Sequence, residues 1–183
     1  MSVRIEAPLS AKAAAALRSG DAVRIYGTIY VARDAAHKRM VEGLKRGEPL
    51  PFDPDGAVLY YMGPSPAKPG RPIGSAGPTT SYRMDPYTPT MLAQGVRAVI
   101  GKGSRSQAVK DALREYGAVY LAAVGGAAAL IAKSIKEAEV IAFPDLGAEA
   151  VLRLLVEDFP AIVVNDTVGG DLYQEAKQIW ARK

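Results

Sequence analysis

Two short segments of the sequence concentrate side chains that can bind a small anion. The first, GKGSRS at 101–106, lies between an expected strand and an expected helix, where free backbone N–H groups and the helix dipole favour an anion. It is not a dinucleotide fingerprint, because Ser106 occupies the third glycine position, and its spacing is not that of a P-loop. A tight turn with solvated cations is the alternative interpretation.

The second segment, GPTTSYRMD at 77–85, lies in the one long irregular stretch of the chain, residues 63–90, which is rich in proline and glycine. Connections of this length in a compact domain are usually functional or disordered. The planar guanidinium of Arg83 can bind a carboxylate through two hydrogen bonds, and the hydroxyl of Thr79 can exchange a proton where its surroundings activate it. An ordinary turn with capping hydroxyls is the alternative.

Arg33 offers a further cation at the carboxyl end of an expected strand, which is where open α/β sheets usually bind ligands. A surface salt bridge is the commoner role of an isolated arginine. His37, the one histidine, shares an expected helix face with Met40, Val41 and Leu44. That pattern is more typical of a core histidine than of a catalyst.

The elements that must position these side chains alternate between helix and strand. Helices are expected at 10–19, 35–46, 88–94, 106–116, 127–133 and 170–182, and strands at 22–32, 57–62, 96–100, 118–122 and 138–143, with further candidates at 150–156 and 161–164. Ser10, Asp34 and Thr88 are expected N-caps. The pattern predicts a single α/β domain over 1–183 with a largely parallel sheet and flanking helices. An apolar stripe should dock the last helix on the core.

Composition excludes several functional classes for this chain. Without cysteine, and with one histidine, it offers no disulfide, no thiol nucleophile and no ligand set for zinc or an iron–sulfur cluster, so we expect no metal here. The net charge of +4 is spread along the chain, which argues against nucleic acid as a partner. Because no signal peptide and no apolar run of about 20 residues is present, we expect a cytoplasmic protein with no membrane contact.

Several segments, taken in order, are similar to one known family. They are GTIYVARDAAH, LPFD followed by GAVLYYMGP, GPTTSYRMD, GKGSRS, VGGAAAL, DLGAEA and VEDFPAIVVND. Together they resemble the β subunit, or C-terminal domain, of class I iron–sulfur fumarases and of the related tartrate dehydratases. The resemblance runs in register over roughly residues 20–175, and an ordered set of motifs is far more specific than one short motif.

This resemblance implies a swivelling β/β/α fold and a two-part hydro-lyase that hydrates fumarate reversibly to L-malate. A cysteine-bearing α subunit would hold the [4Fe–4S] cluster, and this chain would be the β subunit of a heterodimer or heterotetramer. Carried over residue by residue, Arg33, Arg83 and Lys102 would bind the carboxylates of a small dicarboxylate substrate. Thr79 would take the C3 proton with help from the partner, because no group in this chain is expected to activate it.

The sequence departs from the fumarase pattern at Ser81 and Tyr82, which replace the Ala-Gly of the usual Thr-Thr-Ala-Gly-Arg. Tartrate dehydratases resemble the Thr-Thr-Ser form. However, their glycine turn lacks the Ser-Arg-Ser continuation at 104–106, and the VGGAAAL segment is similar to fumarases. We therefore expect fumarate and malate as substrates, with an L-tartrate dehydratase β subunit as the first alternative and a non-catalytic anion-binding module as the second.

Overall fold

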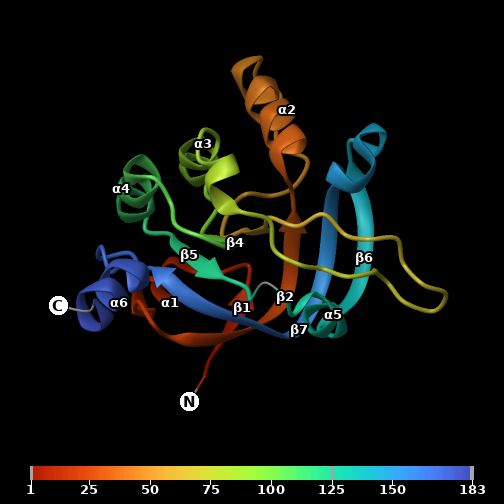
Figure 1. The fold of residues 1–183 in the computed structure, drawn as a ribbon. Coiled ribbons are helices and arrows are strands. Elements are labelled where there is room, and N and C mark those ends of the chain that lie inside the picture. Colours follow the sequence, from red (N-terminus) through yellow and green to blue (C-terminus); the bar gives the residue numbers. More distant parts are fainter. Residues whose placement is uncertain (1, 125, 182–183) are drawn as a thin grey trace.

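The strands of the described residues form one strongly curved seven-stranded sheet (Figure 1). The computed structural model describes residues 2–124 and 126–181. The strands are β1 (Val3–Ala7), β2 (Ala22–Val31), β3 (Val58–Tyr60), β4 (Ala98–Gly101), β5 (Val119–Ala122), β6 (Ile135–Ala142) and β7 (Val151–Asn165). Their order is β1-β2-β3-β4-β5-β7-β6, and β2 also pairs with β7. The pairings therefore close β2, β3, β4, β5 and β7 into a ring.

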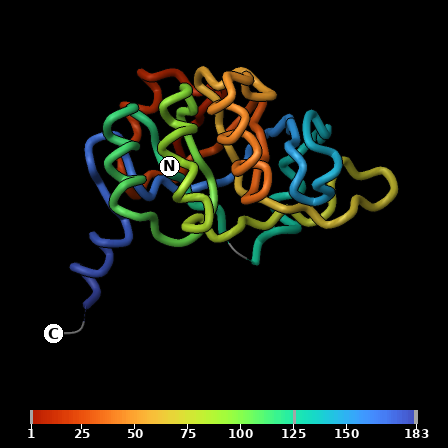
Figure 2. Tube along the Cα trace, turned by 90° about the horizontal axis from the view of Figure 1, so that it is seen from above, coloured from red at the N-terminus to blue at the C-terminus, as the bar shows by residue number. Residues whose placement is uncertain are grey.

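Helices connect the strands and cover the outside of this ring. They are α1 (Ala11–Ala16), α2 (Asp34–Lys45), α3 (Thr88–Ala93), α4 (Gln107–Glu115), α5 (Ala128–Lys133) and α6 (Leu172–Trp180), with 3-10 helices η1 (Ser81–Met84) and η2 (Pro144–Glu149). Both views show α2, α3 and α4 side by side on one flank of the sheet (Figures 1 and 2). None of the helices in the described ranges has the length and hydropathy of a membrane-spanning segment.

Side chains alternate along the central strands between two buried clusters. Tyr60 of β3 and Ile100 of β4 belong to a cluster built from all strands of the ring. Leu59 and Val99, their neighbours in sequence, belong to a second cluster that includes residues of α2, α3 and α4. Since both faces of these strands are buried, the strands are apolar throughout, as in parallel sheets covered on both sides.

The prediction of a largely parallel sheet is right only for part of the molecule. Strands β1 to β5 pair in parallel, but β7 runs antiparallel to β2, β5 and β6. The two expected strands at 150–156 and 161–164 are in fact one strand of 15 residues. It continues through the polar Glu157 and Asp158 because pairing with β2 holds it, with Asp158 at a positive φ of 59°. The swivelling β/β/α character and the single domain stay predictions.

Two of the three expected helix caps are placed differently from the prediction. Ser10 caps α1 as expected, because its hydroxyl accepts a hydrogen bond from Ala13 N at 3.1 Å. Asp34, by contrast, is the first helical residue of α2, and Arg33 precedes it without a capping bond. Thr88 likewise lies inside α3, after Tyr87. Both side chains are bonded to other parts of the fold, which removes them from the capping role.

The last helix does not dock on the core along its length. Figure 2 shows α6 leading away from the body of the molecule. Leu172 and Tyr173 in its first turn pack against the core, but Ile179 and Trp180 are 71% and 81% exposed. The expected apolar stripe is present, yet nothing among the described residues covers its far half. Residue 182, part of the expected helix, lies outside the described residues.

His37 is buried inside the helical flank, as its apolar stripe predicts. It has no exposed surface, and its ring meets the ring of Tyr61 edge-on at 5.4 Å between centroids. Its Nδ1 lies 2.8 Å from the carbonyl oxygen of Arg33. A carbonyl only accepts hydrogen bonds, so Nδ1 carries the proton of the neutral ring. Burial, together with the charge of the nearby Arg105, lowers the pKa of His37 to about 4, even though the hydrogen bond to the Arg33 carbonyl raises it.

This depressed pKa predicts a loss of stability in acid. The unfolded chain binds the imidazole proton with a pKa near 6.5, whereas the folded chain resists it down to about 4. His37 therefore contributes fully above pH 6.5, and up to about 3 kcal/mol is lost as the pH falls from 6.5 to 4. Urea unfolding of the wild type and of His37→Gln across this range should show the extra loss in the wild type alone. Parallel pH profiles would contradict the prediction.

Candidate active site

The long irregular segment returns to the sheet and places Thr79 next to Lys102. Residues 78–80 run between the ends of β3 and β4, where Thr79 N donates to the carbonyl oxygen of Tyr61 at 2.7 Å. Lys102 N donates to the carbonyl oxygen of Thr79 at 3.3 Å, and Ser81 N donates to that of Lys102 at 2.8 Å. The strand-like pairing satisfies the backbone of the segment, and it brings together two of the residues that the sequence singled out.

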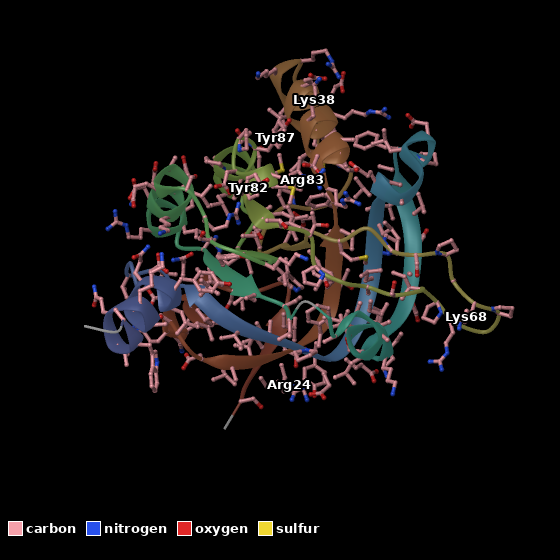
Figure 3. All side chains as sticks on the ribbon, in the orientation of Figure 1. Arg24, Lys38, Lys68, Tyr82, Arg83 and Tyr87 are labelled. Atoms are coloured by element: carbon pink, nitrogen blue, oxygen red, sulfur yellow. The ribbon has the colours of Figure 1, made fainter. Side chains whose placement is uncertain are left out.

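Arg83 lies in η1, directly after this pairing, and faces the start of α2. Its Nε donates to Oδ1 of Asp34 at 3.0 Å. Figure 3 shows Arg83 close to α2 with Tyr82 beside it, whereas Arg24 lies at the opposite end of the sheet and Lys68 far out on the loop. The guanidinium is 44% exposed, so a ligand can reach it.

Arg33 comes from the end of β2 and is held from several directions. Its Nη2 lies 3.4 Å from Oε1 of Glu149, and its side chain is 21% exposed. The other carboxylate oxygen of Glu149 accepts from Ala35 N at 3.0 Å, so this side chain also serves the start of α2. The guanidinium passes so close to Gly63 that a Cβ atom there would collide with it. Arg33 is therefore fixed in place before any ligand arrives.

The candidate site carries a small positive charge in total. Arg33 and Arg83 each have a carboxylate beside them, Glu149 and Asp34, whereas Lys102 makes no ion pair within the described residues. Three cations and two carboxylates leave a formal surplus of one charge. A dianion bound here would need further positive charge from elsewhere, or would have to displace the two carboxylates.

Thr79 is half-buried, and its hydroxyl has no hydrogen-bond partner in residues 2–124 and 126–181. No base is therefore placed beside it by this part of the chain. That this chain alone does not activate Thr79 stays a prediction.

The turn at 101–106 leaves neither the start of α4 nor both of its cations free for an anion. Ser106 caps α4 through its hydroxyl, but its backbone N–H donates to Oδ2 of Asp85 at 2.7 Å. The start of α4 therefore already holds a carboxylate of its own chain. Arg105, one of the two cations of the turn, is buried, and its Nε donates to Oδ1 of the same Asp85 at 2.7 Å. Lys102 is the exposed cation of the turn.

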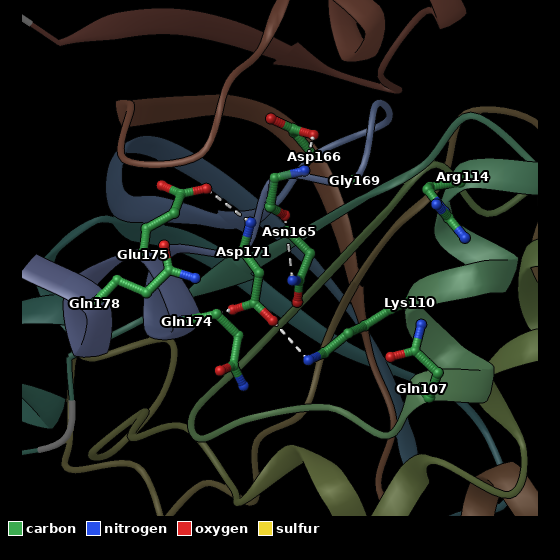
Figure 4. A pocket seen from close by; sticks show the side chains of 11 residues that line it. Gln107, Lys110, Arg114, Asn165, Asp166, Gly169, Asp171, Gln174, Glu175 and Gln178 are labelled. Carbon is green, nitrogen blue, oxygen red and sulfur yellow. Dashed lines mark hydrogen bonds and ion pairs between the residues drawn. The ribbon is translucent and has the colours of Figure 1, made fainter.

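A hollow of about 360 Å³ between α4 and α6 is a less suitable active site (Figure 4). Its charged groups bind one another. Lys110 pairs with Asp171 at 2.6 Å, and Glu175 accepts from the backbone N–H of Asp171. Asp166 accepts from the backbone N–H groups of residues 19, 168 and 170. The hollow thus has little free charge, and none of the four predicted site residues lines it.

The chain does not fit an iron–sulfur cluster of its own. It has no cysteine, and the described residues contain no group of three or more histidine, aspartate or glutamate side chains arranged to hold a metal ion.

Sequence reasoning missed the carboxylates of the site. Asp34, Asp85 and Glu149 each contact a residue far away in the sequence, and no local pattern marks such a contact. The available signal is only that Asp34, Asp85 and Glu149 lie within the recognised segments ARDAAH, GPTTSYRMD and DLGAEA. In the recognised segment VGGAAAL, Gly125 lies outside the described residues.

Comparison with known proteins gives relatives along most of the chain. Fumarate hydratase 2 of Leishmania major is 44% identical over 158 residues, which cover 85% of this chain and 28% of that protein. The aerobic class I fumarate hydratase of Escherichia coli is 44% identical over 151 residues, covering 81% of this chain and 28% of the relative. A Methanocaldococcus jannaschii protein named as an L(+)-tartrate dehydratase subunit beta is 40% identical over 168 residues, which cover 88% of this chain and 86% of that protein.

The chain thus spans little more than a quarter of the length of these fumarate hydratases, but most of the length of the tartrate dehydratase subunit. The family profile described as Fumarase C-terminus matches residues 1–176, which include every residue of the candidate site. The chain belongs to the fumarase C-terminus family.

Proposed function

We propose that this chain is the β subunit of a two-subunit hydro-lyase that hydrates fumarate reversibly to L-malate. The observation that supports this proposal best is the return of residues 78–80 to the sheet, which brings Thr79, Arg83 and Lys102 to one edge near Arg33. Fumarate hydratases among the relatives make that reaction the first candidate.

The cations would act on the charge that develops during the reaction. In the dehydration direction, removal of the C3 proton of malate moves charge onto the neighbouring carboxylate, and fixed cations oppose that charge in the transition state. A cation 4 Å from it is worth about 4 kcal/mol at an effective dielectric of 20, before desolvation is subtracted. Arg33 is already held by Glu149 and needs little rearrangement when substrate binds, whereas Arg83 would exchange its ion pair with Asp34 for a substrate carboxylate.

Thr79 would exchange the proton at C3 while the hydroxyl group leaves C2, so that water and fumarate form. Its hydroxyl needs a base, and the described part of this chain provides none beside it. We therefore assign the activating carboxylate to the α subunit. The cysteines for a [4Fe–4S] cluster would come from the same subunit, because this chain has none.

L-tartrate dehydration is the second candidate. The relative named as a tartrate dehydratase subunit beta is matched over 86% of its length, so it has nearly the same extent as this chain. Tartrate and malate share two carboxylates and a hydroxyl group next to the C–H bond that breaks. The same cations and the same Thr79 would serve either substrate.

Reconstitution tests the proposal directly. Isolated from its source with its larger cysteine-bearing partner and loaded without oxygen, the complex should hydrate fumarate, and each subunit alone should not. Fumarate consumption and L-tartrate consumption measured on the same preparation decide between the two substrates. A complex with its full complement of iron–sulfur cluster that converts neither substrate would contradict the proposal.

Replacing Arg83 should affect the reaction far more than the fold. Because its guanidinium is an exposed cation at the proposed site, Arg83→Ala should lower kcat/KM of the complex by about 100-fold or more. Its ion pair with Asp34 is exposed, so thermal unfolding should change little. Arg46→Ala is the matched control, since Arg46 forms a similar exposed pair with Glu48 at the far end of α2. Equal kcat/KM for both variants and wild type would count against a role for Arg83.

Thr79 can be tested by isotope exchange. Thr79→Val keeps the shape of the side chain but removes the hydroxyl, so the complex should bind malate and yet stop exchanging its C3 hydrogen with D₂O. Thr79→Ser restores a hydroxyl and should restore part of the exchange. NMR of malate incubated with each complex in D₂O measures this. Wild-type exchange rates in Thr79→Val would show that another group takes the proton.

A further inference from the structure

Two turns that are distant in sequence must keep a fixed separation at the candidate site. One turn carries Thr79 and Arg83, and the other carries Lys102. Two backbone hydrogen bonds join them, from Ser81 N and from Lys102 N, at 2.8 Å and 3.3 Å. The second bond is at the long end of the usual range, so these bonds alone form a weak connection.

A buried arginine lies beneath both turns and binds them together. The side chain of Arg105 has no exposed surface. Its Nε donates to Oδ1 of Asp85 and its Nη2 to the hydroxyl of Thr88, each at 2.7 Å. The guanidinium carbon also lies 5.4 Å from the ring centre of Tyr61 and 5.0 Å from that of Tyr120. Two acceptors and two aromatic rings thus contact the charge, while Nη1 has no hydrogen-bond partner among the described residues.

Further hydrogen bonds connect the two turns. Asp85, which follows η1, accepts from Ser106 N with its second oxygen at 2.7 Å. The hydroxyl of Tyr120 donates to the carbonyl oxygen of Gly103 at 2.7 Å and accepts from the hydroxyl of Ser81 at 3.0 Å. Each turn therefore both donates and accepts hydrogen bonds in the buried region around Arg105, Asp85 and Tyr120.

The contacts around Gly101 show how closely the turns approach. A Cβ atom at this position would collide with the hydroxyl of Ser81 and touch the ring of Tyr61. The packing leaves no room for the turns to slide past each other while Arg105 and Asp85 stay paired. Removal of either partner would leave the other charge buried without compensation, which is strongly unfavourable.

We propose that Arg105, through Asp85, is a positioning residue that sets the separation between the turn of Thr79 and Arg83 and the turn of Lys102. The consequence for catalysis rests on the proposed function, whereas the effect on the two turns does not. Arg105 itself is enclosed and would not touch the substrate. It acts by holding the groups that do.

Hydrogen exchange on the complete chain tests the structural part. Arg105→Met should speed exchange of the Ser81 and Lys102 amides by about 100-fold or more, because it leaves Asp85 buried without its partner. Arg105→Lys keeps the charge but not the planar guanidinium that donates to both Asp85 and Thr88, so it should speed exchange of the same amides by a smaller factor. Amides in the centre of β2, such as that of Ile29, should keep their protection in both variants.

Lys110→Met is the matched control. Lys110 forms a 2.6 Å ion pair with Asp171, with the side chains 20% and 13% exposed, and this pair joins α4 to the start of α6. The contact of Lys110 with the 101–106 turn is a backbone hydrogen bond to the carbonyl oxygen of Ser106, which Lys110→Met keeps. This variant should leave the Ser81 and Lys102 amides protected. If Arg105→Met does not fold, Arg105→Lys decides alone. Unchanged exchange at both amides, equal acceleration across the sheet, or the same acceleration in the control would overturn the proposal.

Activity of the reconstituted complex supplies the second readout. A misplacement of about 1 Å can cost roughly 100-fold in rate, so Arg105→Lys should lower kcat/KM for fumarate strongly and raise KM. Loss of folded protein alone would lower the apparent kcat and leave KM unchanged, and that result would overturn a positioning role. If the wild-type complex converts no fumarate, the proposed function fails, while the exchange experiment still decides whether Arg105 sets the two turns.

Discussion

An arginine enclosed by protein keeps its charge only where acceptors and aromatic faces surround it. Arg105 is held by Asp85, Thr88 and two tyrosine rings, and those partners come from the residues directly after β3 and η1, from α3 and from β5. Desolvation of a guanidinium is costly, so the fold is stable only when all of these elements take their places together. The same compensation recurs at the surface, where Glu149 faces Arg33 and Asp34 faces Arg83. Charge pairing therefore fixes the geometry at the carboxyl ends of the strands.

This pairing also limits what the chain can do alone. The ion pair of Arg83 and Asp34 is exposed, and such pairs contribute little free energy, so a substrate carboxylate can compete for the guanidinium. Lys102 needs no such exchange, because it has no carboxylate beside it in the described residues. A dicarboxylate nevertheless brings two negative charges to a cluster with a surplus of one. The described residues alone thus do not balance the charge of a dicarboxylate, and the second subunit of the proposed function would have to bring further positive charge.

Local patterns located most of the elements, although not β1, but they did not show the contacts between them. The strands and helices around the site follow from alternation and from caps such as Ser10 and Ser106, because those signals act within a few residues. The course of β7 through Glu157 and Asp158 depends on pairing with β2, which the sequence does not encode locally. The apolar residues of α6 have helical spacing, yet this spacing does not show which surface would cover Ile179 and Trp180. For the same reason Thr79 and Arg83 were found from residue type, whereas the partnership of Asp85 with Arg105 was not.

The structure changes the meaning of one departure from the fumarase pattern. Ser81 makes the segment resemble tartrate dehydratases, but its side chain is buried, bonded to the hydroxyl of Tyr120 and packed against Gly101. The hydroxyl of Ser81 therefore serves as a buried hydrogen-bond partner of Tyr120 and does not face a substrate. Tyr82, the other departure, is 65% exposed and points out of the core. Ser81 is thus not in a position to distinguish a second hydroxyl group on a substrate, whereas the exposed Tyr82 lies beside Arg83. If the chain acts as proposed, selection between fumarate and tartrate would come from Tyr82 and from groups that the proposed partner brings, and not from Ser81.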